Sequence, residues 1–185
     1  MNDLSKKTKA LDMIAKWAKK GGIPVAAFLF GSVVYVNANS ECSHSITSFR
    51  CVTYLENYDG DTIKVNIPSV HPLLGKEASI RVKNIDVAEL RSSDPCEVEV
   101  AKRAKEFTGS LLRGEGTTIH LENIERGKYF RILSDVRYSP PAMDDLLDLG
   151  SALIVMGYAV PYDGGTKPDV DWCGVFLETF RIDDE

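Results

Sequence analysis

The chain has 185 residues, of which 44% are hydrophobic and 26% charged, and its formal net charge at pH 7 is −5. These values are those of an ordinary globular protein, and the length suits one domain with its own hydrophobic core. The negative charge argues against a protein that holds nucleic acid by bulk charge attraction.

The first 38 residues have the composition of an export signal. Six lysines lie within residues 1–20, an uncharged apolar run extends over residues 23–36, and Ala38 ends a small-residue site. This order is typical of a secretory leader, so we predict cleavage after Ala38 and an exported protein, periplasmic or secreted. The apolar run is short for a full membrane span. The alternatives are a buried N-terminal helix of a cytosolic protein and a retained signal anchor, the second because the basic segment is long and Pro24 interrupts the apolar run.

Cleavage would leave 16 basic and 25 acidic residues, a net charge of −9. A domain so acidic needs a bound cation and a local group of basic side chains if it acts on nucleic acid.

The cleaved chain would also keep an even number of cysteines, which in an exported chain predicts disulfides with three possible connectivities. Reduced structural thiols are the alternative, and no zinc-ligand spacing is present. These cysteines are Cys42, Cys51, Cys96 and Cys173.

The predicted domain begins with a flexible polar entry over residues 39–50. Residues 51–58 and 62–67 have the character of strands and flank Asp59-Gly60-Asp61, which predicts a hairpin in which Gly60 takes a positive φ. Residues 68–78 contain two prolines and a glycine, so we predict an extended loop there.

A third strand is predicted over residues 79–85, where apolar and basic side chains alternate. Arg81 would lie on its polar face. The chain is then expected to turn over residues 86–89, which would let the carboxylates of Asp86 and Glu89 converge on one point. Together with Asp61, these groups would be costly to gather unless a hard divalent cation such as Ca²⁺ or Mg²⁺ bound beside a phosphate.

Two helices follow from capping and periodicity. Asp94 can cap a helix whose first residue is Pro95, with Glu97 three residues after the cap, and Gly114 ends it. A second apolar stripe at helical spacing ends at Gly157. The predicted core-facing residues are Val100, Ala104, Phe107 and Leu111 in the first helix and Leu146, Leu149, Leu153 and Met156 in the second.

Two further strands are predicted over residues 117–122 and 130–138, with a polar loop at residues 125–128. The tail, residues 164–185, would pack on the domain, form a short helix or remain flexible. Five short strands with a helix after the third are compatible with a small closed β-barrel, although the pattern leaves other α+β folds open. We therefore predict a mainly β, α+β domain over residues 51–163 with two to three helices.

The polar motifs resemble the staphylococcal nuclease (thermonuclease) family over about residues 50 to 163. The resemblance rests on three groups of residues in the same order, and on their spacing. They are Asp59-Gly60-Asp61-Thr62, then Arg81, Asp86 and Glu89, then Lys128-Tyr129-Phe130-Arg131, followed by Leu153, Ile154, Gly157 and Ala159.

The resemblance implies a five-stranded OB-type barrel and a Ca²⁺-dependent nuclease that acts on DNA and RNA with little sequence preference. Asp61, Asp86 and the backbone carbonyl of Val87 would bind the metal, and Glu89 would activate water. Arg81 and Arg131 would clamp the phosphate. We expect a monomer without stable membrane association after cleavage. The substrate-contacting residues implied are Lys128, Tyr129 and Tyr162.

Three residues depart from the family pattern. Ala88 stands where Pro is common, Gly127 where Asp is usual and Phe130 where a small Gly precedes the second arginine. They put the rate of the reaction in doubt and support an alternative, a catalytically impaired OB-type module that binds single-stranded nucleic acid or a protein partner. Asp59 is predicted to shape the turn rather than to bind metal.

Overall fold

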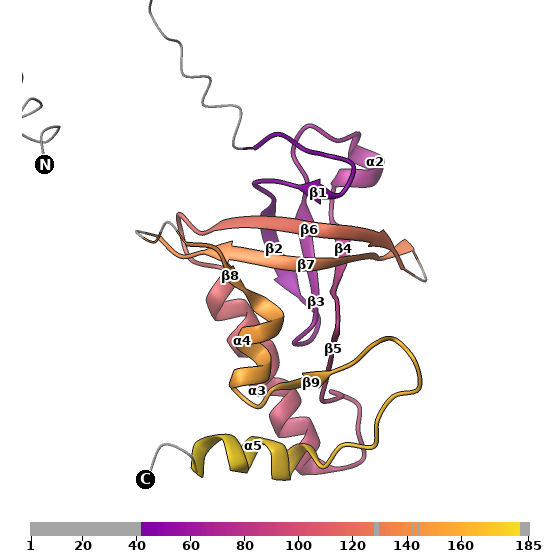
Figure 1. The fold of residues 1–185 in the computed structure, drawn as a ribbon, viewed down its shortest axis with the longest axis vertical. Coiled ribbons are helices and arrows are strands. Elements are labelled where there is room, and N and C mark those ends of the chain that lie inside the picture. The colour runs from indigo at the N-terminus through magenta and orange to yellow at the C-terminus, as the bar shows by residue number, and fades with distance from the viewer. Residues whose placement is uncertain (1–41, 128–129, 142, 144, 182–185) are drawn as a thin grey trace, which may run out of the picture. The chain divides into compact units, whose positions relative to one another are not determined.

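The computed structural model describes residues 42–127, 130–141, 143 and 145–181. The predicted leader, Lys128 and Tyr129 lie outside these residues. The described part is mixed α+β, which confirms the predicted class (Figure 1). Its strands are β1 (Ser48–Phe49), β2 (Thr53–Asn57), β3 (Thr62–Asn66), β4 (Ala78–Val82), β5 (Ile85–Val87), β6 (Thr118–Arg126), β7 (Ile132–Ser139), β8 (Leu147–Asp148) and β9 (Ala159–Pro161). Its helices are α2 (Pro72–Gly75), α3 (Pro95–Leu112), α4 (Leu149–Val155) and α5 (Trp172–Arg181).

Seven strands form one sheet in the order β1-β6-β7-β4-β3-β2, with β8 paired to β7. All pairs are antiparallel except β4 with β7. The strand pairings do not close into a barrel, because β1 and β2 are the two ends of the order. One hydrogen bond, from Val52 N to Ile119 O at 2.9 Å, joins the chain just before β2 to β6. The described sheet has seven strands where five were predicted, and the five-stranded OB-type barrel stays a prediction.

The predicted third strand is interrupted. β4 ends at Val82, and Asn84 takes a φ of +61°, a left-handed conformation that asparagine tolerates better than most residues. The chain then forms β5, which pairs with β9 in a separate two-stranded sheet. Asp86 therefore lies on a strand and not in a turn, which corrects the prediction for residues 86–89.

The entry segment is also more ordered than predicted. Ser48 and Phe49 pair with β6, and a disulfide joins Cys42 to Cys51. The His120 side chain accepts a hydrogen bond from Cys51 N at 2.9 Å. A short polar segment acquires fixed structure here because covalent and long-range contacts hold both of its ends.

Helix α3 begins as predicted. The Asp94 carboxylate accepts a hydrogen bond from Cys96 N at 2.9 Å, and Pro95 is the first helical residue. Glu97 does not complete a capping box, because its carboxylate accepts hydrogen bonds from Ser92 Oγ and from Glu89 N. The helix therefore holds the backbone of Glu89 in place. Its buried residues are Val100, Ala101, Ala104, Thr108, Gly109 and Leu112, while Phe107 and Leu111 are partly buried.

Gly60 allows the β2–β3 hairpin to approach α3 closely. The prediction that it takes a positive φ is wrong. Its φ does not lie in the left-handed region. A Cβ at this position would lie 2.9 Å from Ala104 Cβ and 3.3 Å from Val87 Cγ1. The Gly60 carbonyl accepts a 2.7 Å hydrogen bond from Thr108 Oγ1. Glycine is needed because the hairpin between β2 and β3 packs directly on α3.

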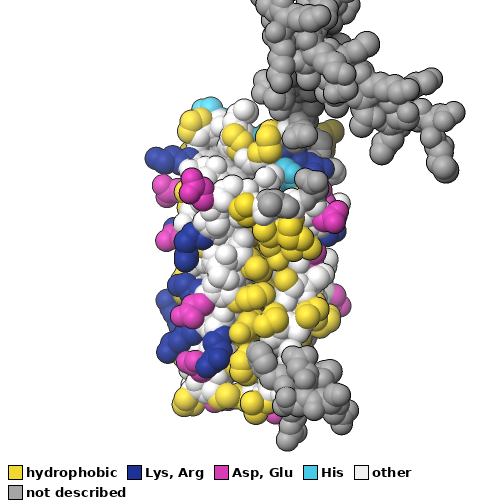
Figure 2. Space-filling view, turned by 90° about the vertical axis from the view of Figure 1, so that its left-hand side faces the viewer, with side chains coloured by type: hydrophobic (Ala, Val, Ile, Leu, Met, Phe, Trp, Pro, Cys, Tyr) yellow, Lys and Arg dark blue, Asp and Glu magenta, His cyan; other side chains and the backbone are white. Residues whose placement is uncertain are grey.

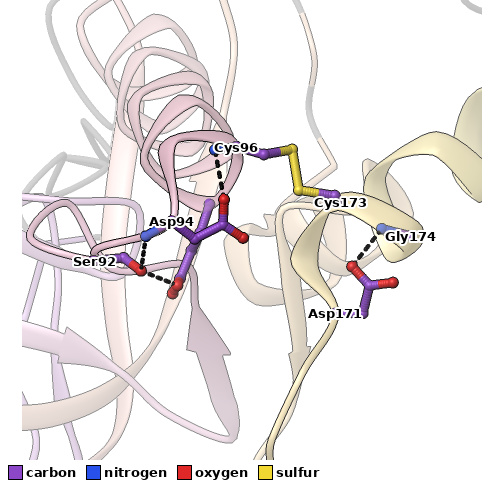
Figure 3. Close-up of a disulfide and its surroundings, with 7 residues drawn as sticks. Ser92, Asp94, Cys96, Asp171, Cys173 and Gly174 are labelled. Atoms are coloured by element: carbon purple, nitrogen blue, oxygen red, sulfur yellow. Dashed lines mark hydrogen bonds between the residues drawn. A yellow bond between two sulfur atoms is a disulfide. The ribbon is translucent and has the colours of Figure 1, made fainter.

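The C-terminal part packs on α3. Cys173 of α5 forms a disulfide with Cys96, and the Asp171 carboxylate caps α5 through Gly174 N at 3.0 Å (Figure 3). The ring of Phe176 stacks on that of Tyr158, with centroids 5.6 Å apart. Residues 172–181 of the tail therefore form a helix that packs on the domain, which combines two of the three outcomes considered.

Three smaller differences concern the loops and α4. Residues 72–75 form the one-turn helix α2 inside the predicted loop. Helix α4 begins at Leu149, so Leu146 lies outside it and is 38% exposed, while Gly157 at a φ of +66° follows its end as predicted. The polar loop predicted at residues 125–128 starts later, because β6 continues to Arg126.

The core lies between the inner face of the sheet and helices α3 and α4. Its fully buried large side chains include Ile63, Ile80, Ile119, Leu121, Leu149 and Leu153. Hydrophobic side chains also reach the surface, and Figure 2 shows them as a band down one face of the protein. Among the described residues, none of the helices combines the length and apolar character needed to cross a membrane.

Candidate functional site

The turn between β2 and β3 is shaped by Asp59, as predicted. Asp59 Oδ1 accepts hydrogen bonds from Asp61 N at 3.1 Å and from Thr62 N at 2.7 Å. Asn57 donates from its amide to Asp59 O at 2.7 Å and to Lys105 O on α3 at 2.9 Å. These bonds fix the turn against the helix and direct the next carboxylate, that of Asp61, toward β4.

The Asp61 carboxylate is completely buried. Its Oδ1 accepts hydrogen bonds from Arg81 Nη1 at 2.7 Å and from Thr62 Oγ1 at 3.0 Å, whereas its Oδ2 has no hydrogen-bond partner. Burial, followed by the charge of Asp59, raises the pKa of Asp61 to about 8, although the Arg81 guanidinium acts to lower it. A buried carboxylate oxygen without a partner is costly, and a bound cation would satisfy it.

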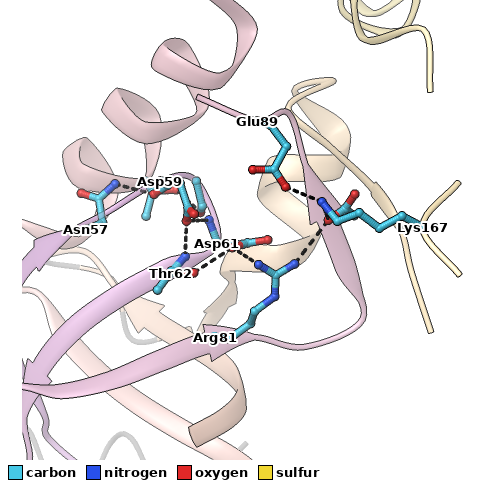
Figure 4. Close-up of polar contacts among 10 residues, drawn as sticks. Asn57, Asp59, Asp61, Thr62, Arg81, Glu89 and Lys167 are labelled. Atoms are coloured by element: carbon cyan, nitrogen blue, oxygen red, sulfur yellow. Dashed lines mark hydrogen bonds and ion pairs between the residues drawn. The ribbon is translucent and has the colours of Figure 1, made fainter. Parts of the chain in front are cut away.

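Arg81 joins two acidic residues, one in the turn before β3 and the other on β5. Its Nη1 pairs with Asp61 and its Nη2 lies 3.3 Å from Asp86 Oδ1 (Figure 4). The Asp86 side chain is 4% exposed, so both partner carboxylates are removed from bulk water. Arg81 lies on the less buried face of β4, as the alternation along that strand predicted, and it holds the two carboxylates close together.

Glu89 lies just beyond β5, and its side chain is 62% exposed. Its carboxylate pairs with Lys167, whose Nζ also lies 3.0 Å from Asp86 Oδ1 (Figure 4). Desolvation acts to lower the pKa of Lys167, but the hydrogen bonds that its ammonium group donates to Glu89 and Asp86 outweigh this effect, and the pKa is raised. Sequence analysis did not select Lys167, because it lies in a loop rich in Gly, Asp and Pro with no recognised motif.

The backbone carbonyl of Val87 takes no part in the hydrogen bonds between β5 and β9. Tyr162 N donates to Asn84 O at 3.0 Å, which makes residues 84 and 162 a hydrogen-bonded antiparallel pair. Because such pairs alternate, Asp86 pairs in the same way with Val160, and the Val87 carbonyl points away from β9. The Val87 carbonyl oxygen, which the family resemblance implies as a metal ligand, thus lies outside the β5–β9 ladder.

The donor set is compatible with a hard divalent cation. It comprises the unpartnered Asp61 Oδ2, the buried Asp86 carboxylate and the Val87 carbonyl, all of them oxygen ligands. No three or more His, Cys, Asp or Glu side chains of the described residues gather as a metal-binding group. The protein would therefore supply two carboxylates and one carbonyl, and water and phosphate oxygens would complete the coordination.

Arg131 does not join this cluster. It lines a separate cavity of about 850 Å³ with residues of α2, β4 and the β6–β7 hairpin. Within the described residues its guanidinium makes no ion pair with an acidic side chain. Its neighbour Phe130 has a φ of +61° and is 87% exposed, and Arg126 lies over the Phe130 ring at 5.5 Å. Arg81 and Arg131 thus line different cavities, and the clamp of one phosphate by both arginines stays a prediction.

Tyr162 lies close to the cluster. It lines a smaller cavity of about 260 Å³ together with Arg81 and Asn84, and its hydroxyl donates to Gly165 O at 2.7 Å. Its position is compatible with the predicted contact to substrate. Of the described residues that were predicted for the site, Asp61, Arg81, Asp86, Val87, Glu89 and Tyr162 gather at one end of β3, β4 and β5, whereas Arg131 does not.

The comparisons with known proteins do not extend these observations. A scan against protein-family models finds no match, and a search of curated proteins finds no relative.

Proposed function

We propose that the protein is a metal-dependent phosphodiesterase that cleaves DNA and RNA with little sequence preference. The main support is the arrangement around Arg81, which holds the buried carboxylates of Asp61 and Asp86 next to the exposed carboxylate of Glu89. The unpartnered Asp61 Oδ2 is a cost that a bound Ca²⁺ ion would remove. The order of the motifs and their resemblance to the thermonuclease family support the same assignment.

In this proposal each side chain has one task. Asp61, Asp86 and the Val87 carbonyl would hold Ca²⁺, which when bound would neutralise charge on the phosphate. Glu89, the most exposed acid of the group, takes a proton from the attacking water. Arg81 stays between Asp61 and Asp86 and offers the phosphate oxygens the guanidinium N–H groups that do not bond these two carboxylates.

The resemblance also carries a finer proposal for the fold. The strands β2, β3, β4, β6 and β7, with α3 following β5, have the order expected of an OB-type barrel. The Val52 to Ile119 hydrogen bond supports this proposal, because it links the first of these strands to the fourth. Tyr162, together with Lys128 and Tyr129, would contact the nucleotide.

Export and a monomeric state are part of the proposal. The two disulfides pair all four cysteines, and this pairing supports export of the protein to an oxidising compartment. Mass spectrometry of the mature N-terminus tests the leader directly. We expect the chain to begin at Asn39, and an intact Met1 or a longer retained segment would contradict cleavage after Ala38.

The function is tested with the full chain on single-stranded DNA, double-stranded DNA and RNA, with Ca²⁺ and with chelator. We expect cleavage of all three only with the metal. Glu89→Gln should lower kcat by about 10²–10⁴, the usual contribution of a general base. Glu99→Gln is the matched control, since Glu99 is also an ion-paired surface glutamate, 55% exposed. No hydrolysis with any divalent cation would refute the proposal.

The position of Arg131 favours a second candidate, the impaired OB-type module. With one guanidinium lining another cavity, the phosphate would be held from one side only. Such a module would bind single-stranded oligonucleotides or a protein without cutting. Oligonucleotide binding in fluorescence anisotropy that persists in chelator, with no hydrolysis under Ca²⁺, Mg²⁺ or Mn²⁺, would favour it over the nuclease.

A further inference from the structure

Lys167 lies on a loop that is anchored at both of its ends. The loop connects β9 to α5. At its start, Tyr162 N is bonded to Asn84 O, and just after its end Cys173 is joined to Cys96 of α3. Between these anchors the Lys167 side chain reaches Asp86 and Glu89, the second of which is 78 residues distant in sequence.

The Lys167 ammonium group pairs with two acidic side chains of the site. Asp86 Oδ1 already has Arg81 Nη2 at 3.3 Å, and Lys167 Nζ approaches the same oxygen at 3.0 Å. The second partner of Lys167 is Glu89, the residue assigned to water activation. One lysine therefore neutralises one acid that would bind the metal and another that would bind the water.

We propose that Lys167 is a positioning residue that acts as an internal counter-ion and competes with the divalent cation for this site. The inference rests on the function proposed above. Without metal, Lys167 balances the charge of Asp86 and keeps Glu89 oriented. The metal would be a third cation on Asp86, beside Arg81 and Lys167, so repulsion between like charges makes Lys167 leave Asp86 and release Glu89.

The chemistry of the side chain suits this exchange. The Lys167 side chain is 47% exposed, and an ion pair so open to water is weak. Lysine carries its charge on a flexible stem with freely rotating donors, so it can leave without moving the backbone. Arg81 is different, because its forked donors are fixed between two buried carboxylates. Of the two cations on Asp86, Lys167 is the one that a metal can displace.

The experiment is calorimetric titration of Ca²⁺ into the full chain and three variants. Lys167→Gln removes the competing charge, and we expect its apparent Kd for Ca²⁺ to fall by about fivefold. Lys167→Arg keeps the charge and should bind Ca²⁺ within about twofold of the natural protein. Lys64→Gln is the matched control, because Lys64 also pairs with one glutamate, Glu56, and has the same exposed fraction of 47%.

Lysine acetylation read by mass spectrometry supplies a second measurement that needs no enzymatic activity. Ca²⁺ should raise the reactivity of Lys167 and leave that of Lys64 unchanged. Ca²⁺ binding of equal strength in the natural protein and Lys167→Gln would overturn the inference and leave the proposed function standing. No Ca²⁺ binding by any variant would overturn both.

Discussion

Arg81 Nη1 donates a 2.7 Å hydrogen bond to Asp61 Oδ1, while Asp61 Oδ2 is buried without a partner. One oxygen of this carboxylate is therefore satisfied and the other is not. The arrangement is expensive for a side chain that serves stability alone, because a buried polar atom without a hydrogen bond costs about 1–3 kcal/mol. It is reasonable for a side chain whose second oxygen binds a cation.

The first prediction concerns pH. The pKa of Asp61 is raised from 3.8 to about 8 in the folded protein by burial, so the folded state holds this proton more tightly than the unfolded chain. The stability that results is complete below about pH 4 and is lost as the pH rises through about 8. In chelator, we expect the free energy of unfolding to fall across this range, as measured by urea denaturation.

Asp61→Asn separates this effect from other titrations, because asparagine resembles the protonated acid in shape and stays neutral. In chelator near pH 9 the variant should be more stable than the natural protein by about 1–3 kcal/mol, and the difference should vanish near pH 4. A constant difference at every pH would show that Asp61 titrates normally.

The second prediction concerns metal. Ca²⁺ at about 100 times its Kd should raise the free energy of unfolding by about 2.7 kcal/mol, because it binds only the folded state. Asp86→Asn should abolish this gain, since Asp86 is one of the two carboxylates held by Arg81. Asp135→Asn, at a carboxylate bonded to Asn123, should keep it. Thermal denaturation with and without chelator measures both, and an equal Ca²⁺ effect in the two variants would exclude Asp86 as a ligand.

The third prediction concerns packing beneath the site. Gly60→Ala would place a Cβ 2.9 Å from Ala104 Cβ, so the hairpin must move away from α3. We expect a loss of about 1–3 kcal/mol in the free energy of unfolding. Gly150→Ala is the control, because its nearest contacts are 3.4 Å and it lies in α4, where alanine is favoured. Equal stability of the two variants would contradict the close approach.

The fourth prediction compares the two disulfides. Cys96 and Cys173 are separated by 77 residues, and Cys42 and Cys51 by 9. The longer loop loses more entropy in the unfolded chain, so its removal by double Cys→Ser substitution should cost about 2 kcal/mol more than removal of the shorter one. Guanidinium denaturation of the two double variants measures this difference. A larger cost for the Cys42 and Cys51 pair would contradict it.

Several structural features could be predicted from residues that lie close together in the sequence. Asp94 and Pro95 mark the start of α3, Asp59 marks a turn, and alternation along β4 puts Arg81 on the polar face. Each depends on bonds within a few residues, where local propensity and periodicity decide the outcome. The break at Asn84 was missed because residues 79–85 form an uninterrupted strand pattern, and only pairing of β5 with β9 explains the change of direction.

The amino-acid sequence alone determined the α+β class, the position of α3 and the choice of Asp61, Arg81, Asp86 and Glu89 as one candidate group, because these follow from local pattern and from residue chemistry. Only the tertiary structure decided which cysteines pair, that Arg131 lines another cavity and that Lys167 joins the site. Those outcomes depend on contacts between residues far apart in the chain, and the free energy of such contacts is set by the packing of the whole domain rather than by any one segment.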